Sequence, residues 1–126
     1  MGLTKMEEYG YLVEKSRRLS EELLIDEARR REVFENLGTY LRRLVEVVKG
    51  LDPSSEVYLF GSVAEGRYLL SSDIDVLVVA DANPGKVLAE LWLAGIRDPF
   101  EIHVVARKAL ELYRRRSKLV RVEPHP

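Results

Sequence analysis

The sequence predicts an α/β fold (α+β in a finer classification), with a small mixed β-sheet, flanking helices and an N-terminal helical arm or hairpin. Three observations support this class. Helical periodicity fills the first 50 residues, β-rich apolar runs occur near 56–60, 74–80 and 100–106, and helical or turn patterns separate those runs. We therefore divide the chain into an N-terminal helical segment, 1–50, packed on the same domain or on a partner, and a core, 51–126.

Composition narrows the class of protein further. The 126 residues suffice for one domain, and 20 basic against 21 acidic residues leave a net charge of −1. We therefore expect no strong nucleic-acid binding. There is no cysteine, so disulfides and cysteine-based zinc sites are excluded. No apolar run approaches the ~20 residues of a membrane span, and the N-terminus does not resemble a signal peptide. We expect a soluble cytoplasmic protein that does not bind membranes.

The N-terminal segment shows apolar residues at steps of three and four. A first series contains Met6, Tyr9, Leu12, Val13, Leu19 and Leu23, and a second contains Val33, Phe34, Leu37, Tyr40, Leu41, Leu44, Val45 and Val48. Ser20 or Asp26 could cap a new helix, so we expect a possible break between them. Gly50 and Pro53 end the helical region.

The sequence of the core, 51–126, predicts three strands and two helices. The run 74–80 is apolar on both faces, which is typical of a central strand. A turn at 82–85 leads into a helix over 86–94, and a strand over 100–106 is followed by a helix over 107–116. The tail, 118–122, is either a short edge strand or an extended arm.

Two short motifs indicate where the chemistry occurs. Gly61-Ser62 follows the first strand, and Ser72-Asp73-Ile74-Asp75 opens the second. Asp73 and Asp75 are two residues apart, so on a strand their side chains share a face. Carboxylates so placed can bind divalent cations, and a glycine-serine turn that opens a helix can offer backbone N–H groups to phosphate.

The third strand supplies a further carboxylate. Glu101 and His103 alternate with apolar residues and share one face. If this strand lies beside the second, Glu101 can join Asp73 and Asp75. Asp73 and Asp75 would then bind the magnesium ion that carries a nucleoside triphosphate, all three carboxylates would bind a second ion, and Glu101 could act as a general base. His103 could border this site or be a bystander.

At these residues the chain resembles the minimal nucleotidyltransferases of the antitoxin type, within the DNA polymerase β-like nucleotidyltransferase superfamily. The resemblance lies in Gly61-Ser62, Asp73-Ile74-Asp75 and a later acidic strand residue, and covers about residues 56–106. It implies a nucleotidyltransferase fold, ATP as substrate and two Mg²⁺ ions, with Mn²⁺ as a possible substitute. It places the catalytic and metal-binding carboxylates on Asp73, Asp75 and Glu101, and the nucleotide-binding turn on Gly61 and Ser62.

The same resemblance implies a biological role. Relatives of this size are commonly encoded with a helical HEPN-domain protein, a ribonuclease toxin, and can adenylylate a tyrosine of that partner. Three departures stand against the family pattern. Val63 replaces a basic residue, although Arg67 could compensate; Glu101 stands where aspartate is more common; and the N-terminal helical segment is longer than the minimal form.

Other functions remain open at the level of sequence. The chain could be a non-catalytic binding module that neutralises a helical partner, which Val63 and Glu101 favour. Transfer to a small molecule or an RNA end ranks lower, because such enzymes usually need an additional substrate domain. The apolar stripe of the N-terminal helices could be covered within the chain or by a second copy. The acceptor and the base preference are not determined.

Overall fold

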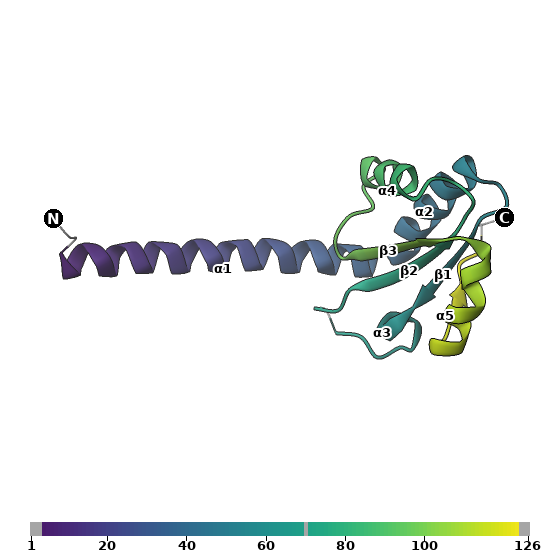
Figure 1. The fold of residues 1–126 in the computed structure, drawn as a ribbon. Helices are drawn as coiled ribbons and strands as arrows, with labels where there is room; N and C mark the ends of the chain where they lie inside the picture. The colour runs from purple at the N-terminus through teal and green to yellow at the C-terminus, as the bar shows by residue number, and fades with distance from the viewer. Residues whose placement is uncertain (1–3, 70, 124–126) are drawn as a thin grey trace.

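The structure, a computed structural model, describes residues 4–69 and 71–123 (Figure 1). The elements, in chain order, are α1 (Lys5–Glu35), α2 (Leu37–Leu51), β1 (Glu56–Phe60), α3 (Gly61–Ala64), β2 (Ile74–Val79), α4 (Pro84–Leu93), β3 (Phe100–Val105), a 3₁₀ turn (Arg107–Ala109), α5 (Leu110–Arg116) and β4 (Val120–Arg121). The expected α/β class is confirmed.

The sheet has four strands in the order β3-β2-β1-β4. β1 pairs antiparallel with β2 and β4, whereas β2 and β3 are parallel and are joined through α4. β2 therefore occupies a central position, as its two apolar faces predict. The C-terminal tail forms the short edge strand β4.

Helices cover the two faces of the sheet unequally (Figure 1). On one face, Val57, Ile74, Val76 and Val78 pack with residues of α2 and α4 in the main core. α2 contributes Leu41, Leu44, Val45 and Val48, and α4 contributes Val87 and Leu91. Each such buried side chain stabilises the fold by about 1.5–3 kcal/mol.

The opposite face has a smaller core. Tyr58, Leu77 and Val79 pack with Leu110, at the start of α5. Residues two apart on a strand share a face, so Asp75 lies on this same face, beyond the cluster that α5 covers. The arrangement of helices therefore leaves the Asp75 end of this face for polar side chains.

The expected break between Ser20 and Asp26 is wrong. α1 is continuous from Lys5 to Glu35, and the interruption lies at Asn36. No glycine or proline occurs in 20–26, and Ser20 and Asp26 make contacts within the helix: the Ser20 hydroxyl donates to the Ser16 carbonyl, and Asp26 pairs with Arg30. At Asn36 the side-chain amide donates to the Glu32 carbonyl, and this local bond competes with regular helix.

Only the C-terminal part of α1 is anchored to the domain. Val33 is fully buried, and the ring of Phe34 stacks on Tyr68 with centroids 5.1 Å apart. Arg29 Nε donates to the carbonyl of Asp98 over 3.0 Å. The rest of α1 projects away from the sheet (Figure 1).

Within the described ranges, 4–69 and 71–123, no helix combines the length and the apolar character needed to cross a membrane.

Candidate active site

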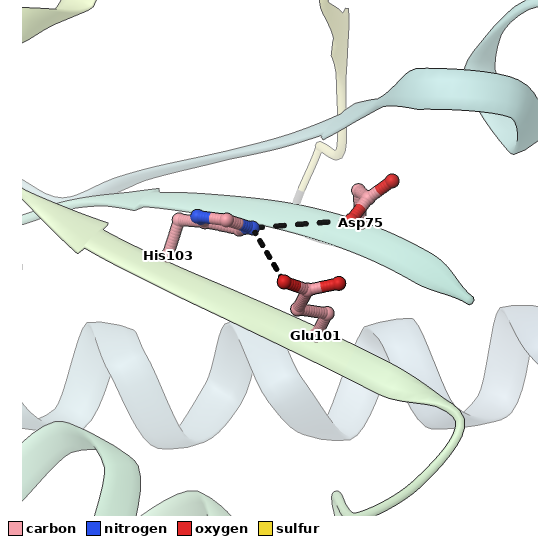
Figure 2. Close-up of side chains that lie close together, drawn as sticks. All are labelled: Asp75, Glu101 and His103. Carbon is pink, nitrogen blue, oxygen red and sulfur yellow. Dashed lines mark ion pairs between the residues drawn. The ribbon is translucent and has the colours of Figure 1, made fainter.

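Strand pairing brings two of the predicted carboxylates together. β2 and β3 run parallel with Asp75 directly opposite Glu101, so the condition under which Glu101 can join the aspartates, adjacency of these two strands, is met. Both side chains point from the same face of the sheet toward one another (Figure 2). The Asp75 side chain is 25% exposed and that of Glu101 is 56% exposed. One carboxylate thus lies in a partly buried position and the other at its open side.

His103 completes the group from the next position on this face of β3. Its Nε2 lies 3.8 Å from Asp75 Oδ1 and 3.6 Å from Glu101 Oε1 (Figure 2). Both distances are too long for hydrogen bonds, and Nε2 is a buried atom with no hydrogen-bond partner among the described residues. The ring of Phe60 packs edge-on against the imidazole at 5.1 Å and helps to hold its orientation.

Gly61 brings the end of β1 close to Asp75. Phe60 is the strand partner of Asp75, and the chain turns at the next residue with a φ of 72° at Gly61. A Cβ placed on Gly61 would collide with Asp75 Oδ2 and lie 3.2 Å from Asp75 Cγ. Glycine is therefore required twice here, for the left-handed backbone and for the close approach to the carboxylate.

Ser62 is the second residue of the single turn α3, directly after Gly61. Its carbonyl accepts a hydrogen bond of 2.9 Å from the backbone N–H of Arg67, which closes the turn. The side chain of Arg67 is exposed and pairs with Glu65. In this structure Arg67 is therefore engaged within its own loop.

Asp73 lies outside the group formed by Asp75, Glu101 and His103. It precedes β2, its side chain is 56% exposed, and Arg30 Nη2 lies 3.7 Å from Asp73 Oδ1. Arg30 also donates to the carbonyls of Ser71 (3.3 Å) and Ser72 (3.2 Å). α1 thus supplies a cation that holds the segment before β2.

The electrostatics of Asp75 follow from its position. Burial raises the pKa of its carboxyl above the ordinary value, and the neighbouring negative charge of Glu101 raises this pKa further. His103 acts in the opposite direction. A divalent cation bound near these carboxylates would relieve the repulsion that raises the pKa of Asp75.

The donor atoms fit a divalent cation. Asp75, Glu101 and His103 each offer one ligand atom, and these three atoms all lie within 4.8 Å of one another. The partnerless His103 Nε2 faces both carboxylates, and a coordinated cation would satisfy it. Two carboxylate oxygens and an imidazole nitrogen can serve Mg²⁺ through the oxygens, and they also suit ions such as Mn²⁺ that accept nitrogen.

A mixed sheet with acidic groups on two adjacent strands, beside a glycine turn, is an arrangement suited to metal-assisted chemistry. The family model described as "Nucleotidyltransferase domain" matches residues 41–123, which include all four strands and this group of side chains. The chain therefore belongs to the nucleotidyltransferase domain family. The matched region begins within α2, so α1 precedes it.

A solved structure agrees with this assignment. The crystal structure of a candidate nucleotidyltransferase from Sulfolobus solfataricus is similar to the chain, with 28% sequence identity and a TM-score of 0.53. The similarity covers 73% of this chain and 84% of the Sulfolobus chain. The comparison with curated proteins gave no match.

Sequence reasoning missed one residue beside the site and underestimated another. Arg30 approaches Asp73 from a helix more than 40 residues away, and no local pattern signals that approach. The alternation of β3 places His103 on the same face as Glu101, but only the structure shows its Nε2 between the carboxylates.

Proposed function

We propose that the chain is a metal-dependent nucleotidyltransferase that transfers a nucleoside monophosphate, AMP from ATP, to a hydroxyl acceptor. The observation that carries this proposal is the juxtaposition of Asp75 and Glu101 across β2 and β3, with Gly61 packed against Asp75. Family membership supports nucleotidyl transfer as the reaction class. ATP, magnesium and the acceptor are part of the proposal.

Each predicted residue has a distinct task in this reaction. Asp75 and Glu101 would hold Mg²⁺ or Mn²⁺, with Asp73 joining them once Arg30 releases its carboxylate. A bound divalent ion would stabilise charge on the phosphate and lower the pKa of the acceptor hydroxyl. Gly61 would admit the triphosphate close to the backbone, and Ser62 would donate its hydroxyl and its N–H to phosphate oxygens.

The proton and the leaving group can be followed through the step. Glu101, the more exposed carboxylate, would accept the proton of the acceptor hydroxyl. The hydroxyl oxygen would then form a bond to the α-phosphorus while the bond to the bridging oxygen breaks. Pyrophosphate would leave with that oxygen. Phe60 would fix the ring of His103 beside the reacting groups.

For the acceptor we propose a tyrosine of a HEPN-type toxin, which would give the chain an antitoxin role. This choice depends on the resemblance of the Gly61-Ser62 and Asp73-Ile74-Asp75 motifs to antitoxin-type enzymes. Co-expression with a HEPN-domain protein from the same genome tests it. We expect the intact mass of that protein to increase by one or more AMP units, and peptide mapping should assign them to tyrosine.

Variants of the site residues test whether the proposed site is responsible for pyrophosphate release and for the mass increase. Asp75→Asn and Glu101→Gln should abolish pyrophosphate release and the mass increase. Asp81→Asn is the matched control, because Asp81 lies beyond the opposite end of β2 and is exposed. Full transfer by both site variants would contradict the proposed site.

A non-catalytic binding module is the second candidate. The observation that favours it is the pairing of Asp73 with Arg30, which holds this carboxylate apart from Asp75 and Glu101. In that case Asp75→Asn would neutralise the partner as well as the wild type does and would still be recovered with it in a pull-down. Neutralisation that requires Asp75 would support catalysis.

A further inference from the structure

The free part of α1 exposes an unusual amount of apolar surface. Nine large apolar side chains on this helix have exposed fractions between 51% and 80%. They are Met6, Tyr9, Tyr11, Leu12, Val13, Leu19, Leu23, Leu24 and Ile25. A helix of this kind gains little from its own propensity in water, and its stability normally comes from packing. An uncovered surface of this size indicates an interaction site.

Five positions of α1 follow a heptad pattern. Steps of three and four residues connect Tyr9, Leu12, Ser16, Leu19 and Leu23, which we call the seam. The same spacing continues to Asp26, Arg30 and the buried Val33, where the helix meets the domain. Of the nine exposed apolar side chains, five lie outside the seam: Met6, Tyr11, Val13, Leu24 and Ile25. The seam therefore has the periodicity of a two-stranded coiled coil.

We propose that α1 pairs antiparallel with α1 of a second copy of this chain. In one register, Leu12 of each copy faces Leu23 of the other, and Ser16 faces Leu19. The flanking positions then place Lys15 opposite Glu22 and Glu8 opposite Arg29, and the two-fold symmetry repeats both pairs. Opposite charges beside the seam are what sets the orientation of such helices.

A parallel pair has the opposite charge pattern. Asp26 of one chain would face Asp26 of the other, and Arg30 would face Arg30. Glu22 of each chain would lie beside Glu27 of the other. Each contact brings like charges together. The antiparallel register has one like-charge contact of its own, because Lys5 faces Arg30 at the end of the seam. The Lys15–Glu22 and Glu8–Arg29 pairs outnumber it, so the balance of charge favours the antiparallel arrangement.

The domain has a hollow where the partner helix would begin. A cavity of about 550 Å³ lies between α1 and the segment before β2. It is lined by Leu23, Asp26, Glu27, Arg30, Leu69 and Ser71. In the antiparallel register Tyr9 of the second copy faces Asp26, so its ring would occupy this hollow and cover the exposed Leu69. The seam and the hollow thus form one continuous surface.

Sedimentation velocity on the full chain tests the proposal, independently of any activity. We expect a species of twice 14.5 kDa. Glu22→Lys should weaken dimerisation by about tenfold, because both Lys15 pairs become repulsive. Glu21→Lys makes the same change one residue away, on the side of the helix that faces away from the partner, and should leave the dimer intact. Lys15→Glu combined with Glu22→Lys should restore it.

A single spin label determines the orientation. The chain contains no cysteine, so Met6→Cys gives one attachment site. In the proposed antiparallel register Met6 of one copy is level with Arg29 of the other, so the two labels are separated by about 35 Å along the axis, at 1.5 Å per residue. A monomer at every concentration, equal effects of Glu21→Lys and Glu22→Lys, or adjacent labels would each overturn the proposal.

Discussion

At the residue scale, the close approach of Gly61 to Asp75 links the turn after β1 to the acidic group. The glycine has a left-handed backbone and leaves no space for a methyl group beside the carboxylate. The same close approach would let a phosphate group reach the backbone and the carboxylate together. Gly61 is therefore the residue whose substitution reports most directly on the geometry of the site.

We predict that Gly61→Ala lowers the free energy of unfolding by about 1–3 kcal/mol and abolishes nucleotidyl transfer. The matched control is Gly66→Ala. Gly66 has nearly the same φ, 71°, but open space where the methyl group would lie. Denaturant unfolding and an ATP-turnover assay of both variants separate the backbone strain that they share from the collision with Asp75. Equal activity of the two variants would contradict the importance of that collision.

A second prediction concerns how far the ionised carboxylate of Asp75 destabilises the folded chain when no metal is bound. Its raised pKa means that folding disfavours the ionised carboxylate, first through burial and then through Glu101. Below the ordinary pKa, near 3.8, the carboxyl is protonated in both the folded and the unfolded chain and does not reduce the stability of the fold. As pH rises from there through the raised folded pKa, stability is lost.

Asp75→Asn should therefore raise the melting temperature at pH 7 in the presence of a chelator. The gain should shrink as the pH approaches 3.8. Saturating Mn²⁺ should reverse the order, because only the wild type gains from strong binding at this carboxylate. Thermal unfolding with and without metal provides the measurement, and a variant less stable than the wild type under both conditions would argue against the electrostatic account.

The local sequence pattern predicts only some of the contacts made by residues of the candidate site. Alternation along the strands correctly places Glu101 and His103 on one face, because the strand period is a property of the backbone. The contact of Arg30 with the segment before β2 depends on how α1 crosses the domain. Such a contact is decided by tertiary packing and leaves no local signal.

At the scale of elements, α1 and α2 show that residues suited to an N-cap do not by themselves determine where a helix begins. Ser20 and Asp26 are good N-cap residues but lie inside α1, where the sequence between them contains no residue that interrupts a helix. The interruption occurs at Asn36, two residues before Gly38. The strands and the central place of β2 were easier to predict, since the run that forms β2 is apolar on both faces, but the order of the other strands has no local signal.

The N-terminal caps of α4 and α1 should differ in their effect on the free energy of unfolding, because α4 is packed on the core and the start of α1 is not. The Asn83 side chain accepts a hydrogen bond of 3.1 Å from the Lys86 N–H at the start of α4, whose Val87 and Leu91 are buried. Asn83→Ala should lower the free energy of global unfolding by about 0.5–2 kcal/mol.

Thr4→Ala removes the equivalent cap of α1, where Thr4 accepts from the Glu7 N–H over 3.2 Å. We expect it to loosen the free end of the helix with little effect on global unfolding, because local opening there does not expose the core. Hydrogen exchange and denaturant unfolding on both variants check this contrast. A larger global effect from Thr4→Ala would show that the free end of α1 is coupled to the core.

At the scale of the whole molecule, one carboxylate ties the helical layer to the sheet. Asp52, at the end of α2, accepts from the backbone N–H of Asp81 over 2.8 Å, just beyond β2. This bond, the Ser54 hydroxyl and the Ser54 N–H together lower the pKa of Asp52 below its ordinary value of 3.8. Two segments 29 residues apart are held in place through its charge.

The direction of this shift predicts part of the acid unfolding of the protein. A lowered folded pKa means that Asp52 contributes stability above pH 3.8, and that this contribution is lost as pH falls through the folded pKa. Asp52→Asn should therefore reduce stability at pH 7 and flatten its dependence on pH below 4. Thermal unfolding across this range measures the effect, and an unchanged acid dependence would exclude the assigned role.

The central position of β2 has a consequence for how substrates can differ. β2 is hydrogen-bonded to a neighbouring strand on each edge, and this pairing fixes the backbone that carries Asp75. Glu101 is attached to the same rigid frame through β3. Under the proposed function, tolerance for acceptors of different shape would therefore reside in the segments 65–69 and 71–73 and in the projecting helix α1. Those are the segments in which changes should broaden or narrow the choice of acceptor while the reaction itself stays the same.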